Sequence, residues 1–149
     1  MKTLLFTKEI DATAQKVWDT LWNPATYSKW TNAFNPDDPV GGFMQTDWQI
    51  GGKTLFLDSS GSGMVTTIKS IDEPYELVFE HLGEMTDERE DITSGGVKSW
   101  AGLLEEYYLT EQNGITTLRA SVQTPDEGME AMDRGFTEGL EEVKRLAEQ

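Results

Sequence analysis

The feature that most constrains the fold is an amphipathic helix predicted in the last part of the chain. A helix start is indicated by Thr124 as the cap, Pro125 at the first helical position and Glu127 three residues after the cap. From there to Glu148, apolar residues recur at steps of three or four and form one stripe, made of Met129, Met132, Phe136, Leu140, Val143 and Ala147. A helix of about 24 residues would be roughly 36 Å long. Its stripe must be buried against the rest of the chain.

The rest of the chain predicts the surface that receives this helix. Residues 3–10 have strand character, and two short helices follow, the first capped by Thr13 and the second running from Asn23-Pro24 to about Trp30. Strand-like segments separated by turn residues come next, at 43–50, 53–58, 63–71, 75–82, 99–110 and 115–123. We interpret the polar stretch 83–98 as an exposed loop, and "EQNG" as a hairpin turn.

This order of elements predicts an α+β fold, in which a mostly antiparallel sheet curls around the long helix. Such an arrangement buries the apolar stripe of the helix and leaves few open sheet edges. The two short helices would cover another part of the same concave surface. A chain of 149 residues without linkers or repeats fits one domain, spanning 1–149.

Composition excludes several classes of function. The formal net charge is −15, from 12 basic and 27 acidic residues, so we expect neither nucleic acid nor a membrane as a partner. The absence of cysteine excludes disulfides and thiolate chemistry, and a single histidine argues against a zinc enzyme. We therefore expect no metal and no cofactor. The apolar run "LLF" near the start is too short for a signal peptide or a membrane span, which predicts a cytoplasmic protein.

Several stretches resemble a known superfamily. They are "KEIDATAQKVWDTLWNPATYSKW", "YELVFEH", "WAGLLEEYYLTEQNGITTLRASV" and the final amphipathic helix. Together they resemble the START-like (SRPBCC) superfamily that includes the birch-pollen allergens, and within it the bacterial single-domain proteins related to the activator of the ninety-kilodalton heat-shock protein ATPase. The resemblance covers essentially the whole chain and implies a helix-grip fold, as a monomer or homodimer. It implies function less directly, because the superfamily includes lipid carriers, hormone receptors, polyketide cyclases and co-chaperone domains.

A curled sheet around a helix leaves room for an internal cavity, which aromatic and methionine side chains would line. Three of the five tryptophans lie in "VWDTLWNPATYSKWTNAF". We place Trp18 in the core, whereas Trp30, Phe34 and Trp100 are candidates for either the core or the mouth of the cavity. The predicted ligand-binding residues are Trp30, Phe34, Trp48, Phe56, Phe79, His81, Trp100, Met129, Met132 and Phe136.

Few residues are candidates for catalysis. His81 shares a predicted strand face with Phe79, and in a cavity it could orient a ligand or transfer a proton. We favour instead a histidine whose nitrogens are satisfied by a neighbour or by solvent. One of Glu105 and Glu106 must face the concave side, but alternation does not tell which one, because both faces of this strand carry apolar residues. Arg119 on the next strand is a candidate partner. We therefore predict no catalytic residue.

Three glycines accompany the apolar stripe of the long helix. Gly128, Gly135 and Gly139 lie within a narrow arc beside it, although glycine inside a helix costs up to about 1 kcal/mol relative to alanine. One explanation is a close approach of the helix backbone to the sheet. The other is that the missing side chains leave room for a ligand beside the adaptable methionines.

Three hypotheses of function follow. The first is a non-catalytic protein that binds a small hydrophobic molecule, such as a lipid, an isoprenoid or a polyketide-like aromatic. The second, which rests on the resemblance, is a co-chaperone-like domain that contacts a chaperone ATPase in a stress response. The third is a cyclase- or hydrolase-type enzyme that uses His81 with Glu105 or Glu106.

Overall fold

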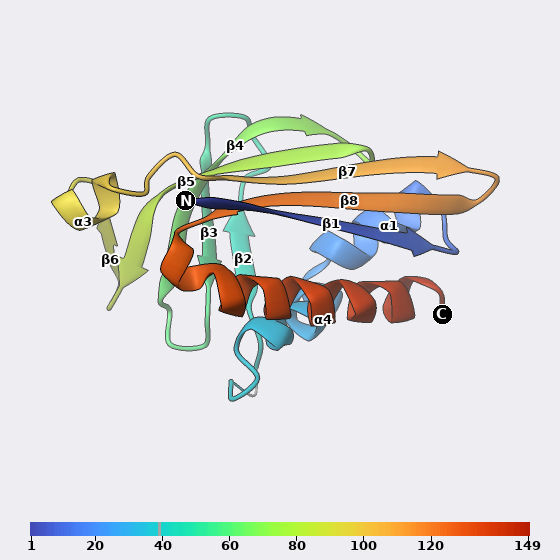
Figure 1. The fold of residues 1–149 in the computed structure, drawn as a ribbon, viewed down its shortest axis with the longest axis horizontal. Coiled ribbons are helices and arrows are strands. Elements are labelled where there is room, and N and C mark those ends of the chain that lie inside the picture. Colours follow the sequence, from blue (N-terminus) through green and yellow to red (C-terminus); the bar gives the residue numbers. More distant parts are fainter. Residues whose placement is uncertain (39) are drawn as a thin grey trace.

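The computed structural model describes residues 1–38 and 40–149. Within them, a curled sheet of eight antiparallel strands wraps around one long helix (Figure 1). The strands follow the order β1-β8-β7-β5-β4-β3-β2, and β6 pairs with β5 outside this path. Their bounds are β1 Lys2–Ile10, β2 Phe43–Thr46, β3 Lys53–Leu57, β4 Gly63–Asp72, β5 Glu76–Thr86, β6 Arg89–Asp91, β7 Leu104–Gln112 and β8 Ile115–Thr124. The predicted α+β helix-grip fold is confirmed.

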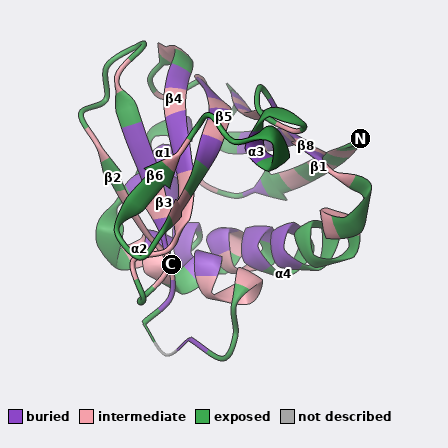
Figure 2. Cartoon of the chain, turned by 90° about the vertical axis from the view of Figure 1, so that its left-hand side faces the viewer, coloured by how far each residue is buried: buried purple, intermediate pink, exposed green. Residues whose placement is uncertain are grey.

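The helices lie on the concave side of the sheet or at its ends (Figures 1 and 2). Their bounds are α1 Ala14–Trp22, α2 Pro24–Thr31, the 3-10 turn η1 Asn32–Phe34, α3 Gly95–Lys98, the 3-10 turn η2 Asp126–Gly128 and α4 Met129–Ala147. Two predicted starts are confirmed. The Thr13 side chain caps α1 by accepting a hydrogen bond from the Lys16 amide, and Asn23 caps α2 ahead of Pro24.

The start of the long helix differs from the prediction. Thr124 still belongs to β8, where it pairs with Lys2 of β1, and its hydroxyl bonds to the Pro125 carbonyl instead of capping a helix. The short turn η2 follows, so the α-helix begins only at Met129. The predicted helix start is therefore about one turn too early, because strand pairing holds Thr124 in an extended conformation.

The two halves of α4 have different surroundings. From Gly135 onward one face is buried, whereas residues 130–134 are exposed (Figure 2). Met129 is half-buried and Met132 is 36% exposed. The buried residues are Gly135, Phe136, Gly139, Leu140, Val143, Leu146 and Ala147. The apolar stripe therefore anchors the helix through its C-terminal two thirds.

The glycines of α4 receive aromatic side chains. A Cβ on Gly135 would clash with the Phe34 ring, and a Cβ on Gly139 would come within 2.9 Å of the Trp30 carbonyl oxygen. The close approach is thus made to α2 and η1, and not to the sheet, which was one of the two explanations that the sequence left open. Protein atoms fill the space beside both glycines, so this close packing explains the two glycines without a ligand.

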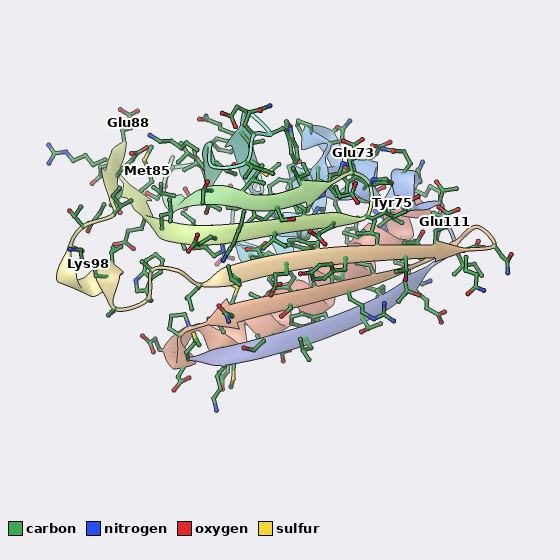
Figure 3. All side chains as sticks on the ribbon, turned by 90° about the horizontal axis from the view of Figure 1, so that it is seen from above. Glu73, Tyr75, Met85, Glu88, Lys98 and Glu111 are labelled. Atoms are coloured by element: carbon green, nitrogen blue, oxygen red, sulfur yellow. The ribbon has the colours of Figure 1, made fainter. Side chains whose placement is uncertain are left out.

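The polar stretch 83–98 is not a loop. Strand β5 continues to Thr86, the chain reverses through Asp87 and Glu88, and β6 pairs back along β5. Both turn residues have positive φ, 51° and 63°, which is the geometry of a tight hairpin turn normally signalled by glycine or asparagine. Ser94 then caps the single turn α3. The hairpin and α3 project beyond one end of the sheet, where Figure 3 shows Met85, Glu88 and Lys98.

The remaining strands match their predictions apart from their ends. The predicted segment 43–50 is a strand only as far as Thr46, and the predicted segment 99–110 begins only at Leu104. The turn "EQNG" is confirmed, because Asn113 and Gly114 both have positive φ between β7 and β8.

Candidate functional site

Four polar side chains form a hydrogen-bonded chain on the concave face of the sheet. The Nδ1 atom of His81 on β5 lies 2.8 Å from the hydroxyl of Thr66 on β4. On its other side, His81 Nε2 lies 3.0 Å from a carboxylate oxygen of Glu105 on β7. The Tyr107 hydroxyl donates to the second oxygen of that carboxylate. Both nitrogens of the only histidine are therefore engaged.

Strand pairing explains why these residues meet. Thr66 lies directly opposite His81 in the β4–β5 pairing. Glu105 lies opposite Phe79, and Tyr107 follows on the same face of β7, fully buried. Because successive side chains of a strand alternate between faces, Glu106 turns to the convex side. The question left open by the sequence is thus decided in favour of Glu105 as the inward carboxylate.

The partner of Glu105 is His81 and not Arg119. Arg119 lies opposite Tyr108, the residue after Tyr107, and is exposed on the outer side of the sheet. The interpretation of His81 as a histidine satisfied by its neighbours agrees with these contacts. Two further threonines extend the row of hydroxyls: Thr54 lies opposite Thr66, and its hydroxyl is 2.8 Å from that of Thr46 on β2.

Burial controls the ionisation of the two inward tyrosines. Desolvation raises the pKa of Tyr107 well above its usual value, and the nearby Glu105 carboxylate raises it further through its charge and its hydrogen bond. The pKa of Tyr27 on α2 is also raised well above its usual value, first by burial and then by the charge of Glu105. Both phenols therefore remain protonated, and that of Tyr107 serves as a hydrogen-bond donor and not as a base.

Aromatic rings enclose this polar chain. Phe56 on β3 packs against Phe79 and His81, with ring centroids 5.0 and 6.0 Å apart. Trp22 at the end of α1 lies at the centre of the cluster, and its ring centroid is within 6.5 Å of six other rings, those of Trp18, Tyr27, Trp30, Trp48, Phe79 and Tyr107. Protein side chains thus fill the space between the sheet and the helices.

The structure divides the predicted ligand-binding residues into three groups. Trp30, Phe79 and Phe136 are core residues that are at most 2% exposed, and His81 is 7% exposed. Phe34, Phe56 and Met129 are half-buried, whereas Trp48 and Met132 are 36% exposed. Trp100 is half-buried in a surface pocket of about 450 Å³ that Met1 and Asp126 also line. The contacts described above bring together Phe56, Phe79 and His81.

Four residues of the site were missing from the predicted list, namely Trp22, Tyr27, Thr66 and Tyr107. The spacing of Trp18 and Trp22, one helical turn apart, was a signal that could have placed both on one buried face. Tyr107 follows from Glu105 by strand alternation once the inward face is known. Within the described residues, no cluster of three histidine or acidic side chains could hold a metal ion. No helix of the described chain is long and apolar enough to span a membrane.

The fold is shared with several solved structures. The Aha1 dimer from Colwellia psychrerythraea matches with a TM-score of 0.71 and 16% identity, over 99% of this chain and 97% of that one. CalU16 from Micromonospora echinospora matches with a TM-score of 0.66 and 14% identity, over 97% of this chain and 75% of that one. DynU16, described as a putative protein in the dynemicin biosynthetic locus, matches with a TM-score of 0.68 and 14% identity. This chain is 97% covered by that match but spans only 46% of the DynU16 chain.

Identities this low establish the fold alone. A comparison with curated proteins finds no match. The sequence itself matches the family described as Activator of Hsp90 ATPase homolog 1-like protein over residues 11–148, which is nearly the whole chain. The chain therefore belongs to the family of Activator of Hsp90 ATPase homolog 1-like proteins.

Proposed function

We propose that the protein binds a small, mostly apolar molecule in the cytoplasm, on the concave face of its sheet and beside the chain Thr66–His81–Glu105–Tyr107. The observation that carries this proposal is a row of polar groups in an otherwise aromatic interior. Ligand sites of small molecules have this composition, with apolar walls and a few placed polar groups that fix orientation.

The ligand must displace side chains, because protein fills the interior. The half-buried Phe56 and Met44 are the candidates, since both pack against the core from the β2–β3 hairpin. That hairpin is the edge of the sheet, and β2 has only four residues. Short edge strands and loops have low local stability. Outward movement of this hairpin would open the space above His81 without disturbing the anchored part of α4.

The binding test uses native mass spectrometry of the purified protein, incubated in turn with oleate, farnesol and a hydroxyanthraquinone. We expect a saturable one-to-one complex with one of the three classes. The matched variants are Glu105→Gln and Glu106→Gln, which make the same change on opposite faces of β7. Affinity should fall at least about fivefold for the inner variant, since a placed hydrogen bond contributes about 1 kcal/mol, and stay unchanged for the outer one. The absence of any saturable complex, or equal effects of both variants, would contradict the proposal.

A second candidate function is favoured by the family match. The family description names an activator of an Hsp90 ATPase, and a structural neighbour is an Aha1 dimer. A role of this kind would use the outer surface of the domain, where the net charge of −15 could attract a basic partner. Addition of the protein to the Hsp90-type chaperone of its host should then raise ATP turnover, in proportion to the amount added. Unchanged turnover at saturating protein would rule this candidate out.

The geometry favours binding over catalysis. His81 and Glu105 do converge, as the enzyme hypothesis requires, but each of their polar atoms already serves another member of the chain. These contacts leave His81 no free nitrogen with which to accept a proton from a substrate. Each Glu105 oxygen keeps a second lone pair that can accept a hydrogen bond from a ligand, which fits an orienting role.

A further inference from the structure

One buried donor in the aromatic cluster has no acceptor. Within the described residues, the indole Nε1 of Trp22 is the buried side-chain nitrogen or oxygen for which no hydrogen-bond partner exists. Trp22 is only 5% exposed. The neighbouring Trp30 shows the usual solution, because its indole N–H donates to the Leu21 carbonyl at 2.9 Å. An unpaired buried donor destabilises a fold, and native structures rarely contain one without a reason.

The surroundings of Trp22 are made of rings. The nearest is Tyr107, with a centroid distance of 4.9 Å in an edge-on arrangement, followed by Phe79 at 5.6 Å. Phenylalanine at position 22 would present similar apolar surface to these rings without an unsatisfied group. The indole N–H is thus a polar group placed in an aromatic environment. Its position suits a ligand atom that accepts one hydrogen bond.

The exposed Trp48 packs against Trp22. Its ring centroid lies 6.5 Å from that of Trp22, and 36% of the residue is exposed. It belongs to the segment between β2 and β3, and its φ of 60° is rare for a bulky residue. A half-exposed side chain on an edge loop can be displaced at lower cost than the core residues beneath it. A ligand that replaces the Trp48 ring would reach Trp22 directly.

We propose that the ligand carries a carbonyl-type acceptor, that the Trp22 indole N–H binds this acceptor, and that the ligand takes the place of the Trp48 ring. This inference rests on the proposed binding function and specifies its ligand class: a flat, neutral, mostly apolar molecule with a ketone or similar oxygen at one end. Aromatic walls receive the apolar body, and the unpaired N–H receives the oxygen.

The test compares two neutral fluorescent probes in the full-length protein. The first is 6-propionyl-2-dimethylaminonaphthalene, whose ketone accepts a hydrogen bond and whose emission shifts when it does. The second is the same naphthalene with a propyl group in place of the propionyl group. Dissociation constants for both are measured in the wild type, in Trp22→Phe, and in the matched control Trp18→Phe, which makes the same change one turn earlier on α1. A thermal unfolding curve for each variant verifies that it folds.

We expect Trp22→Phe to weaken binding of the ketone probe by about tenfold, the cost of leaving a buried carbonyl unpaired, and to change binding of the propyl probe by no more than about twofold. Trp18→Phe should affect the two probes alike, and Trp48→Ala should tighten both. Equal weakening of both probes by Trp22→Phe would overturn the inference while leaving the binding function intact. Failure of both probes to bind the wild type and Trp48→Ala would overturn the inference and count against the binding function as well.

Discussion

The two faces of β7 carry the same pair of residues in different surroundings. On the concave face Tyr107 donates to Glu105, and on the convex face the Tyr108 hydroxyl donates to Glu106 at 2.7 Å. The inner pair lies under aromatic rings, and Glu105 also binds His81. The outer pair is half-buried, without such a cover. Identical local chemistry thus becomes a candidate site on one face and an ordinary surface contact on the other.

The causes that raise the pKa of the two tyrosines reflect this difference. The hydrogen bond to Glu106 is the largest cause that raises the pKa of Tyr108, to about 12. For Tyr107 the largest cause is burial, which raises the pKa well above its usual value. The hydrogen bond to the glutamate is therefore the main cause on the convex face, and burial is the main cause on the concave face.

The largest expected difference comes from removal of the rings. Tyr107→Ala removes a fully buried aromatic side chain, and we expect the free energy of unfolding to fall by about 3–5 kcal/mol. The same change at Tyr108 should cost about 1 kcal/mol, because part of that ring already faces solvent. Urea denaturation of both variants measures the two values. Equal losses would show that the inner face of β7 is not the more tightly packed one.

Removal of the two carboxylates should also destabilise the protein more on the concave face than on the convex face, but by a smaller difference. Glu105→Ala leaves the His81 nitrogen and the Tyr107 hydroxyl without their shared acceptor, and we expect a loss of about 2 kcal/mol. Glu106→Ala leaves a hydroxyl that water can reach, so its effect should be within about 0.5 kcal/mol. Chemical denaturation near neutral pH measures the free energy of unfolding of both variants. If Glu105→Ala left the free energy of unfolding unchanged, water would have replaced the carboxylate inside the fold.

Removal of the hydroxyls alone gives a finer comparison. Tyr107→Phe keeps the ring and deletes one buried hydrogen bond, so we expect a loss of about 1 kcal/mol. Tyr108→Phe should lie within about 0.5 kcal/mol of the wild type. Thermal unfolding by circular dichroism measures both variants. If Tyr108→Phe were the more costly change, the outer hydrogen bond would be the stronger of the two.

Alkaline titration tests the same contrast through linkage. The folded pKa of Tyr107 lies above the unfolded value of about 10, so the native state keeps a proton that the unfolded chain loses. The stability that this tyrosine contributes is complete below pH 10 and is lost as the pH rises from there towards the folded pKa. The decline should be at most about 1.4 kcal/mol per pH unit for each such group. In Tyr107→Phe the decline measured by urea denaturation between pH 9 and 11 should be shallower; an unchanged slope would contradict the assignment.

The architecture could be predicted from the sequence because local patterns, such as apolar periodicity and helix caps, indicate which faces must be buried and where helices begin. The apolar stripe from Phe136 to Ala147 and the alternation in β5 and β8 each allow one buried face, and the caps at Thr13 and Asn23 fix the short helices. The hairpin at Asp87-Glu88 was not predicted, because its two turn residues have positive φ values and the sequence there lacks the glycine or asparagine that usually indicates such a turn. The turn is held by the pairing of β6 with β5.

The site was harder to predict than the fold. Strand alternation placed His81 on one face of β5 with Phe79, and both residues are buried. Strand β7 carries apolar residues on both faces, so the sequence could not distinguish Glu105 from Glu106 as the inward carboxylate. The hydrogen bond to His81 depends on the pairing of β5 with β7, which are separated in sequence by the β6 hairpin and α3. The unpaired N–H of Trp22 is a property of three-dimensional packing alone and leaves no sequence signal.

The pairing of β1 with β8 has a consequence for how the chain is made. Strand β1 spans Lys2–Ile10, whereas its partner spans Ile115–Thr124. Strand β1 is synthesised first, but its partner β8 leaves the ribosome after almost every other strand. The hydrogen-bonding edge of β1 therefore stays unpaired during most of translation. Closure of the sheet and docking of α4 are therefore expected after synthesis, as late and nearly simultaneous events. A chain interrupted before residue 115 would retain an unpaired nine-residue strand, and it would be a substrate for chaperones instead of a smaller folded domain.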